Sequence, residues 1–543
     1  MVLALAVLLG ALGLRLVNCQ RGMWGDEITT FWVSHLPADR IVEERLVHNH
    51  LPTYFLLMHA WTAAVGAGKF TLRLPSIIPG AVAVAAFFLI CARRFPLRLS
   101  LLAAALLALN ATQLFVSQSA RMYGLTGLLE VLFFGCLLAD REAPSRTRYL
   151  AYAAVVVAGC SLHLLFLELA AVAAILILWE ARTLAPPGTA GADAGAIPPK
   201  RLARILIRYL APFLFGGLLM AVWANHAAMI SPGQGTGPEI SWMNVESTPL
   251  PLGRPRETPP RRRVVDPLRT MIRIPFGDTV YSAVLQTGWP KYAARIGLGI
   301  LAGGLAWAAF RRRRFAGVQP GAASADAARC AAQGVDSGLR PEQLRALRFA
   351  LLWALVPPLT VLAGEMAWPW VPGLQLRWLA GGTAAWALLL AGGVCRLPGP
   401  AWRRRAALVT VLALSAYFAS TWLRYPGDGL PQACAYWRAH AAPGDKVFLA
   451  HRGYLEQAME IEQVPLPPES LRSGAVLDDT APELAQRLRE FAAGAAPVWV
   501  LHYQGPRKEI LEQAFALLAP GWRADLVFEC TATSVYRLTP VSR

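Results

Sequence analysis

The sequence predicts a polytopic α-helical membrane protein with a small soluble α/β domain at its C-terminal end. Three observations predict this fold class. The 543 residues are 55% hydrophobic and only 16% charged, whereas soluble domains carry about 25% charged residues. The chain contains repeated apolar runs of a length that can cross a bilayer. Its basic residues gather in the short segments between those runs.

The apolar runs define the membrane-spanning part. About eleven of them come close to the ~20 residues that a spanning helix needs. In chain order they are Met1–Val17, Leu74–Cys91, Leu97–Val116, Gly124–Ala139, Tyr149–Leu162, Leu164–Leu178, Tyr209–Asn225, Tyr292–Phe310, Ala350–Leu362, Trp378–Val394 and Ala406–Leu423. The first run has no basic start and no small-x-small cleavage site behind it, so we interpret it as a retained span rather than a signal peptide. Residues 1–423 are the predicted transmembrane module.

The net charge of +18 carries information on topology. Groups of Lys and Arg lie in loops separated by even numbers of predicted spans: Arg93, Arg94 and Arg98; Arg141, Arg146 and Arg148; Lys200, Arg201, Arg204 and Arg208; Arg311 to Arg314; and Arg396 with Arg403 to Arg405. Short basic loops mark the cytoplasmic side of a membrane protein. The charge therefore needs no nucleic-acid partner, and the loop of residues 19–73 is expected on the non-cytoplasmic side.

One apolar stretch, Pro52–Ala67, leaves two topologies open. If it crossed the membrane, Asp26 would face the cytoplasm. The positive-inside rule would then be obeyed by the arginines before it, Arg15, Arg21, Arg40 and Arg45. The stretch is short, however, and its His59 and Trp61 suit a helix that lies along the membrane surface. We expect the surface helix.

After Arg424 the composition becomes that of a soluble domain, residues 424–543. Its patterns predict helices at Pro431–His440, Ala481–Ala492 and Lys508–Leu518, and strands at Lys446–Ala450, Pro497–His502, Asp525–Cys530 and Ser534–Leu538. Strands that alternate with helices predict a small α/β domain. Cys434 and Cys530 flank it. Whether they form a disulfide, which an oxidising compartment would allow, stays open.

Two adjacent carboxylates, Asp26 and Glu27, follow the first predicted span closely. A carboxylate at the edge of a membrane loses hydration unless it is paired, so acids at this position are candidates for chemistry. The alternative is that both acids stabilise the N-terminal end of a helix at Ile28–Val33. The two residues alone do not decide between these interpretations.

Further polar segments follow on the same predicted side. They are His48-Asn49-His50-Leu51-Pro52-Thr53-Tyr54, His59-Ala60-Trp61, Thr71-Leu72-Arg73-Leu74-Pro75-Ser76 and Ser117-Gln118-Ser119-Ala120-Arg121-Met122-Tyr123. With the carboxylate pair before them, this ordered set resembles the GT-C glycosyltransferases of the protein O-mannosyltransferase and lipid A aminoarabinose transferase type. The resemblance is specific over Trp24–Tyr123 and looser over the rest of the chain.

The resemblance implies a membrane glycosyltransferase that moves a sugar from a polyprenyl-phosphate donor to a lipid, glycan or protein acceptor. It also implies a non-cytoplasmic site and agrees with a surface helix at Pro52–Ala67. A bacterial inner membrane, with the site and the C-terminal domain toward the periplasm, is the expected location. Inverting transfer needs a carboxylate base opposite the leaving phosphate. Asp26 resembles that base, and Glu27 is expected to assist it or to bind the acceptor.

A leaving phosphate also needs cationic and hydrogen-bonding partners. The residues that the resemblance offers for the lipid phosphate or sugar are His50, Gln118, Arg121, Tyr123 and Arg377. Arg121 could bind a phosphate bidentately or extend to the membrane surface as an ordinary interfacial arginine. Arg377 could equally anchor a span at the interface. Two departures weaken the match: Leu51-Pro52 stands where relatives have two prolines, and Ser119 where they often have an acid.

Other titratable residues remain as additional candidates. His48, His50 and His59 could hold a divalent cation, although their spacing fits no zinc pattern; no other cofactor is indicated. His163 and Glu168 lie at the outer turn of a helical hairpin, and Glu130 lies within a span, where an acid either functions or bonds to a neighbouring helix.

The alternative function is a transporter or flippase for a lipid-linked substrate, which predicts broken helices in paired positions. A third interpretation is a non-catalytic scaffold. The identity of the sugar and of the acceptor cannot be predicted from the sequence.

Overall fold

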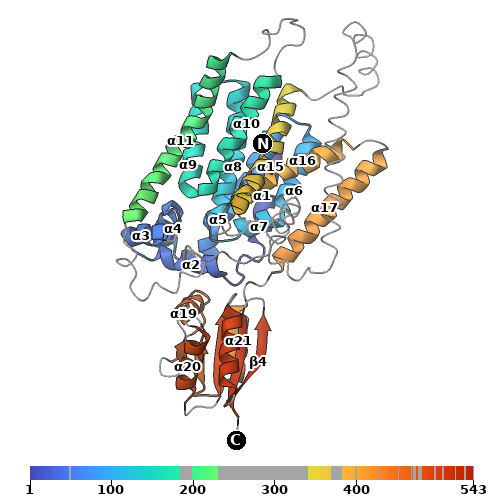
Figure 1. Ribbon diagram of the computed structural model, residues 1–543. Helices are drawn as coiled ribbons and strands as arrows, with labels where there is room; N and C mark the ends of the chain where they lie inside the picture. The colour runs from blue at the N-terminus through green and yellow to red at the C-terminus, as the bar shows by residue number, and fades with distance from the viewer. Residues whose placement is uncertain are drawn as a thin grey trace, which may run out of the picture. The chain divides into compact units, whose positions relative to one another are not determined.

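The computed structural model (Figure 1) describes residues 1–47, 50–183, 198–229, 340–367, 382–397 and 400–541, the last range with short gaps at 426, 428, 451, 466, 469–471, 475–479, 494–496, 504–506, 520 and 531–532. The chain divides into two compact units. The first comprises residues 1–17, 75–222 and 254–424, and the second comprises residues 18–74, 223–253 and 425–543.

The first unit is helical. Its elements are α1 (Val2–Leu16), α5 (Lys69–Ala92, of which residues 69–74 belong to the second unit), α6 (Leu97–Ala108), α7 (Ala111–Ser117), α8 (Tyr123–Glu142), α9 (Arg146–Leu162), η1 (Leu164–Leu167), α10 (Glu168–Thr183), α11 (Pro199–Met229, of which residues 223–229 belong to the second unit), α15 (Pro341–Ala367), α16 (Gly382–Cys395) and α17 (Ala401–Leu423). Within the described residues, the predicted spans coincide with helix. The span Tyr292–Phe310 and residues 378–381 of the span Trp378–Val394 lie outside the described residues.

Within the described residues, 4 helices are long and apolar enough to cross a membrane, or up to 5 if the pair α6–α7 counts as one bent span. The chain is thus a polytopic helical membrane protein, and the total of eleven spans stays a prediction. The bend between α6 and α7 is 58°. It occurs at Asn110, whose side chain accepts a hydrogen bond from the N–H of Gln113 at 3.1 Å and so begins a new helix.

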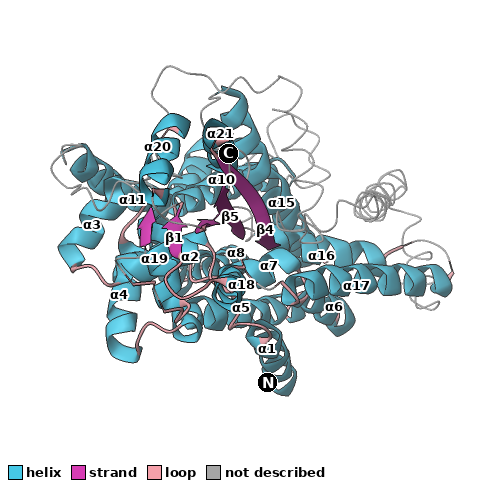
Figure 2. Ribbon diagram, turned by 90° about the horizontal axis from the view of Figure 1, so that it is seen from below, coloured by secondary structure: helices cyan, strands magenta, loops and turns pink. Residues whose placement is uncertain are grey.

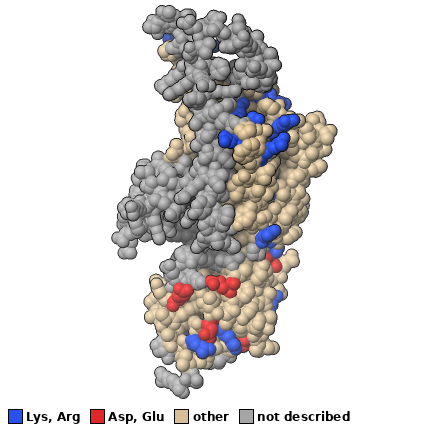
Figure 3. Space-filling model, turned by 90° about the vertical axis from the view of Figure 1, so that its right-hand side faces the viewer, with Lys and Arg blue, Asp and Glu red and all other residues tan. Residues whose placement is uncertain are grey.

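The core of the first unit is aromatic. The ring of Phe133 in α8 lies 5.6 to 6.1 Å from the rings of Tyr152, Phe166, Phe213 and Phe349, which come from α9, η1, α11 and α15. Such contacts join helices that are far apart in the sequence. Ion pairs join several of these helices: Arg94–Glu142, Arg141–Glu180, Arg208–Asp140 and Arg345–Glu180. Figure 3 shows Lys and Arg gathered near one end of this unit, next to a belt without charged side chains.

The second unit joins the loop after the first span to the C-terminal residues. The loop contains α2 (Gly25–Ser34), α3 (Ala38–Val47) and α4 (Thr53–Val65). The C-terminal part contains α18 (Leu430–His440), β1 (Lys446–Leu449), α19 (Arg452–Ile461), β2 (Arg472–Gly474), α20 (Ala481–Ala492), β3 (Val498–Tyr503), α21 (Arg507–Leu518), β4 (Trp522–Cys530) and β5 (Thr533–Pro540). Helix α19 packs against α2.

The strands of the C-terminal part form one sheet in the order β2-β1-β3-β5-β4. Figure 2 labels three strands of this sheet, β1, β5 and β4. Strand β1 pairs in parallel with both β2 and β3, and strand β5 pairs antiparallel with both β3 and β4. Phe448, Val498 and Val500 pack with α20 and α21 on one face. Because side chains alternate along a strand, the buried Val447 and Leu501 belong to the other face, toward α18 and α19. Elements α19 and β2 are absent from the sequence-based prediction.

Helix α4 corresponds to the apolar stretch whose topology the sequence left open. Its 13 residues extend about 20 Å, short of the ~30 Å of a hydrocarbon core. Tyr54, Phe55 and Met58 are fully buried, and the helix packs on α2 and α3. This length and packing agree with the surface helix.

Cys434 and Cys530 do not form a disulfide with each other in the structure. Cys434 is fully buried, and this burial raises the pKa of its thiol to about 12.

Gly427 holds the C-terminal part close to the loop before α2. A Cβ added there would lie 2.6 Å from the carbonyl oxygen of Gly22, and its φ is +90°. Gly444 has φ +93° but nothing within 4 Å of an added Cβ. We therefore expect Gly444→Ala to cost about 1 kcal/mol of backbone strain, and Gly427→Ala to cost more because Gly22 must also move. Thermal unfolding and hydrogen exchange over residues 19–27 measure the difference. Equal effects of the two substitutions would contradict this packing.

Candidate functional site

The carboxylate pair lies in the first turn of α2. Trp24 precedes the helix in an extended conformation, with φ −107° and ψ 166°. Its N–H donates to a carboxylate oxygen of Glu27 at 3.3 Å, which satisfies a backbone donor at the start of the helix. Acids in a first turn also interact favourably with the helix dipole. The helix-end role that the sequence left open is therefore realised by Glu27.

Glu27 also forms a buried bidentate ion pair with Arg73. Its two carboxylate oxygens accept from Nε and Nη2 of Arg73 at 2.7 and 2.6 Å. Both side chains have 0% exposure. Charge-assisted pairs of this parallel geometry are among the strongest polar contacts in proteins. Both oxygens of Glu27 are thus engaged inside the protein.

The remaining donors of Arg73 hold the loop that leads to α2. Nη1 donates to the carbonyl oxygens of Cys19 and Arg21 at 2.6 and 2.9 Å, and Nη2 donates to that of Gly22 at 3.3 Å. A guanidinium has five N–H donors, and each of them is used here. Arg73 therefore fixes a segment of backbone that has no helix or strand of its own. The sequence indicates Arg73 only as part of the Arg-Leu-Pro-Ser motif and does not predict that it binds Glu27 and this loop.

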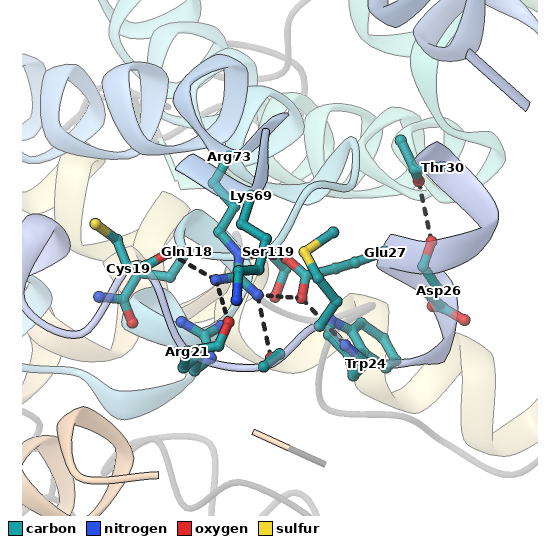
Figure 4. A network of polar contacts seen from close by, with 12 residues as sticks. Cys19, Arg21, Trp24, Asp26, Glu27, Thr30, Lys69, Arg73, Gln118 and Ser119 are labelled. Carbon is teal, nitrogen blue, oxygen red and sulfur yellow. Dashed lines mark hydrogen bonds and ion pairs between the residues drawn. The ribbon is translucent and has the colours of Figure 1, made fainter. Parts of the chain in front are cut away.

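Asp26 is 4% exposed and lies one residue before Glu27. Its backbone carbonyl accepts a hydrogen bond from the hydroxyl of Thr30 at 3.0 Å, inside α2. Figure 4 shows the Glu27 side chain directed toward Arg73, whereas Asp26 leaves the start of the helix in another direction. The two adjacent acids consequently have different surroundings.

The start of α5 and the end of α2 are both tied to α4. Pro75 has no N–H, so the carbonyl of Thr71 loses its partner within α5; the indole N–H of Trp61 donates to that carbonyl at 2.9 Å. His59 Nδ1 donates to the carbonyl of Ser34, the last residue of α2, at 2.9 Å. His59 thus contributes a structural contact in this unit.

The polar segment before α8 belongs to the first unit. The hydroxyl of Ser76 donates to the carbonyl of Arg121 at 2.7 Å. A Cβ on Gly124 would lie 2.6 Å from the Ser76 carbonyl oxygen, so this close approach requires a glycine. The serine of the Arg-Leu-Pro-Ser motif thus positions the backbone of Arg121, which is 3% exposed.

Gln118 is engaged at both ends of its amide. Its Nε2 donates to the carbonyls of Arg15 and Val17 at 2.9 and 2.8 Å, while Oε1 accepts from the indole N–H of Trp422 at 2.5 Å. These contacts join the end of α1 to α7 and α17. Gln118 therefore connects helices of the first unit.

Several other candidates lie in the first unit. The rings of Tyr123 and His163 lie 5.6 Å apart, which brings the starts of α8 and η1 together. Glu168 begins α10. The carboxylate of Glu130 in α8 accepts from the indole N–H of Trp353 at 3.3 Å.

His50, one of the histidines near α4, donates its backbone N–H to the carbonyl of Arg45 at 2.8 Å. The centroids of the His50 and Phe55 rings are 6.3 Å apart. His48 and Arg377 lie outside the described residues. Within the described part of the chain, no group of three or more His, Cys, Asp or Glu residues could hold a metal ion.

No family model and no curated protein matches the chain. Among solved structures, the chain is similar to ArnT from Cupriavidus metallidurans in the apo state, with a TM-score of 0.39, 13% identity and coverage of 99% of this chain and 97% of that chain. For ArnT bound to undecaprenyl phosphate the TM-score is 0.35 and the identity 11%, at the same coverage of 99% and 97%. The oligosaccharyltransferase from Archaeoglobus fulgidus in the apo form has a TM-score of 0.46, 13% identity and coverage of 98% and 74%. These values are low, so the function has to be argued from the residues.

The Arg73–Glu27 pair predicts a large loss of stability when either charge is removed. Arg73→Ala leaves a buried carboxylate without its cation, and we expect a loss of about 3–5 kcal/mol of unfolding free energy. The control is Arg40→Ala, which removes a pair with Glu43 whose side chains are 55% and 40% exposed; exposed pairs contribute about 0–1 kcal/mol. Thermal unfolding in detergent compares the two variants, and similar losses would rule out the structural role of Arg73.

Proposed function

We propose that the protein is a membrane glycosyltransferase that moves a sugar from a polyprenyl-phosphate donor to a lipid, glycan or protein acceptor. The observation that carries the proposal is the division of roles between two adjacent acids. Glu27 is fully buried and bound to Arg73 and to the backbone of Trp24, so we assign it to positioning. We assign Asp26, held in the first turn of α2 by these contacts, as the base.

The chemistry requires one proton acceptor and one site for the leaving phosphate. The acceptor oxygen attacks the anomeric carbon as the bond between that carbon and the phosphate oxygen breaks. Asp26 takes the proton of the acceptor hydroxyl, and polyprenyl phosphate leaves with the bonding electrons. Attack from the face opposite the phosphate inverts the anomeric configuration.

We assign Arg121 to the donor phosphate, because its guanidinium matches the geometry of a phosphate and Ser76 holds its backbone. Tyr123 is a second candidate, and its ring neighbour His163 orients it. Gln118, by contrast, is assigned to the frame of the first unit. His50 and Arg377 remain proposed phosphate contacts on the strength of the sequence alone, and a bound divalent cation is left open.

The transporter alternative is less well supported. It requires broken helices in paired positions that surround a site in the membrane. Among the described helices one bent pair, α6–α7, is found. The carboxylate pair instead lies in a unit built from the loop after the first span and the C-terminal residues, which favours chemistry at the membrane surface. We place this unit on the non-cytoplasmic face of a bacterial inner membrane.

The assignment of Asp26 predicts a selective loss of activity. Asp26→Asn removes the proton acceptor at constant shape, and we expect sugar transfer to fall by about 10²–10⁴-fold, the usual contribution of a general base. The assay uses membranes supplied with undecaprenyl-phosphate-linked pentose and hexose donors and follows release of undecaprenyl phosphate. The control is Asp39→Asn, the same change at an exposed position of α3, which should leave the rate unchanged. Full activity of Asp26→Asn would end the assignment.

The assignment of Arg121 predicts a loss of phosphate binding. With purified protein and undecaprenyl phosphate as the probe, Arg121→Ala should weaken binding by about tenfold or more, since a charge-assisted contact contributes about 1.5–3 kcal/mol. Arg403→Ala, at an exposed position of α17, serves as the control. Unchanged affinity in Arg121→Ala would show that the phosphate binds elsewhere.

A further inference from the structure

Glu462, directly after α19 in the C-terminal part, reaches the loop that carries the carboxylate pair. Its side chain is 2% exposed. One oxygen accepts the backbone N–H of Met23 at 2.6 Å, and the other pairs with the ammonium of Lys69 at 2.7 Å. Met23 lies three residues before Asp26. A residue far along the chain therefore binds the backbone just ahead of the proposed base.

This contact repeats the arrangement of the Glu27–Arg73 pair. Lys69 and Arg73 are four residues apart in α5 and so lie on one face of that helix. Each holds one buried carboxylate, Glu462 or Glu27. The two carboxylates in turn accept the successive backbone N–H groups of Met23 and Trp24. One face of α5 thus fixes the positions of two acids, and these acids bind the consecutive backbone N–H groups of Met23 and Trp24.

The combined contacts restrain the whole approach to α2. The carbonyls of residues 19, 21 and 22 are bound by Arg73, and the N–H groups of residues 23 and 24 by the two glutamates. A reacting group must be held within about 0.5 Å of its productive position, and a displacement of about 1 Å can reduce a rate by about 10²-fold. Loss of one of these contacts should therefore affect the position of Asp26.

We propose that Glu462 is a positioning residue for Asp26, acting through the N–H of Met23, so that the C-terminal part forms an integral component of the active centre. This inference rests on the proposed function. It differs from a purely structural role, in which the ion pair with Lys69 would only attach the C-terminal part to the loop. The two roles use different atoms of the same carboxylate, so substitutions can separate them.

Three variants make the separation. Glu462→Gln keeps an oxygen that can accept the Met23 N–H but removes the charge that pairs with Lys69. The double variant Lys69→Glu, Glu462→Lys keeps an ion pair but places an ammonium donor against the Met23 N–H donor. Glu462→Ala removes both contacts. The control is Glu460→Ala, an exposed acid in the last turn of α19.

If Glu462 positions Asp26, Glu462→Ala should lower kcat about tenfold or more, with KM for the lipid-linked donor changed much less. Glu462→Gln should restore most of kcat, and the charge-exchanged double variant should not, even if it recovers the melting temperature. Glu460→Ala should behave as the unsubstituted protein. Recovery of kcat by the charge exchange, or a normal kcat in Glu462→Ala, would overturn the proposal.

Hydrogen exchange over residues 19–27 gives a readout that does not depend on activity. Exchange should be slow in the unsubstituted protein and in Glu462→Gln, and faster in Glu462→Ala and in the double variant. If exchange follows this order but no donor supports transfer by the unsubstituted protein, the proposed function fails while the positioning contact stands. If transfer is observed and neither exchange nor kcat responds to Glu462→Ala, the positioning role fails and the proposed function stands.

Discussion

The buried ion pair between Arg73 and Glu27 is the interaction on which the candidate site depends. The segment before α2 has no helix or strand of its own, yet its polar backbone groups are buried and need partners. Arg73 supplies them, because one planar guanidinium can bind a carboxylate bidentately and still donate to three carbonyl oxygens. A lysine has three donors and no fixed plane. The arrangement therefore requires arginine at this position.

This pair also explains how two adjacent acids can take different roles. Successive residues in a helix point about 100° apart, so two adjacent buried acids can have different surroundings. Glu27 faces Arg73, and its charge is balanced there. Asp26 stands at the next position back along the first turn, fixed by a helix start that Glu27 itself stabilises. The contacts of Glu27 with Arg73 and with the backbone of Trp24 thus also fix the position of Asp26 in the first turn of α2.

Much of the fold could be predicted from the sequence, because apolar runs and alternating strands record burial directly. Helices in the described part of the predicted spans, and the strands Val498–Tyr503 and Thr533–Pro540, coincide with such patterns. The prediction missed helix α19, although its buried Leu455, Ala458 and Met459 follow the helical spacing i, i+3, i+4. Of the contacts around the candidate site, the sequence indicated the two acids but not the residues that hold them. Asp26 and Glu27 stand out beside a span, whereas the contact of Glu462 with Lys69 joins residues 393 apart in the sequence, and no local pattern encodes that distance.

The start of α5 connects these features. Within two turns, Lys69 holds the residue that follows α19, Thr71 accepts the indole of Trp61 from α4, and Arg73 holds the first turn of α2. The contact at Thr71 exists because Pro75 leaves that carbonyl without a partner inside the helix. Pro75 therefore stands at the start of the apolar part of the span and also leaves the Thr71 carbonyl available to the indole N–H of Trp61. A site built on a loop gains its rigidity from side chains of neighbouring helices. Here one short stretch of helix provides those side chains for three separate elements, so a change in its register would disturb all of them together.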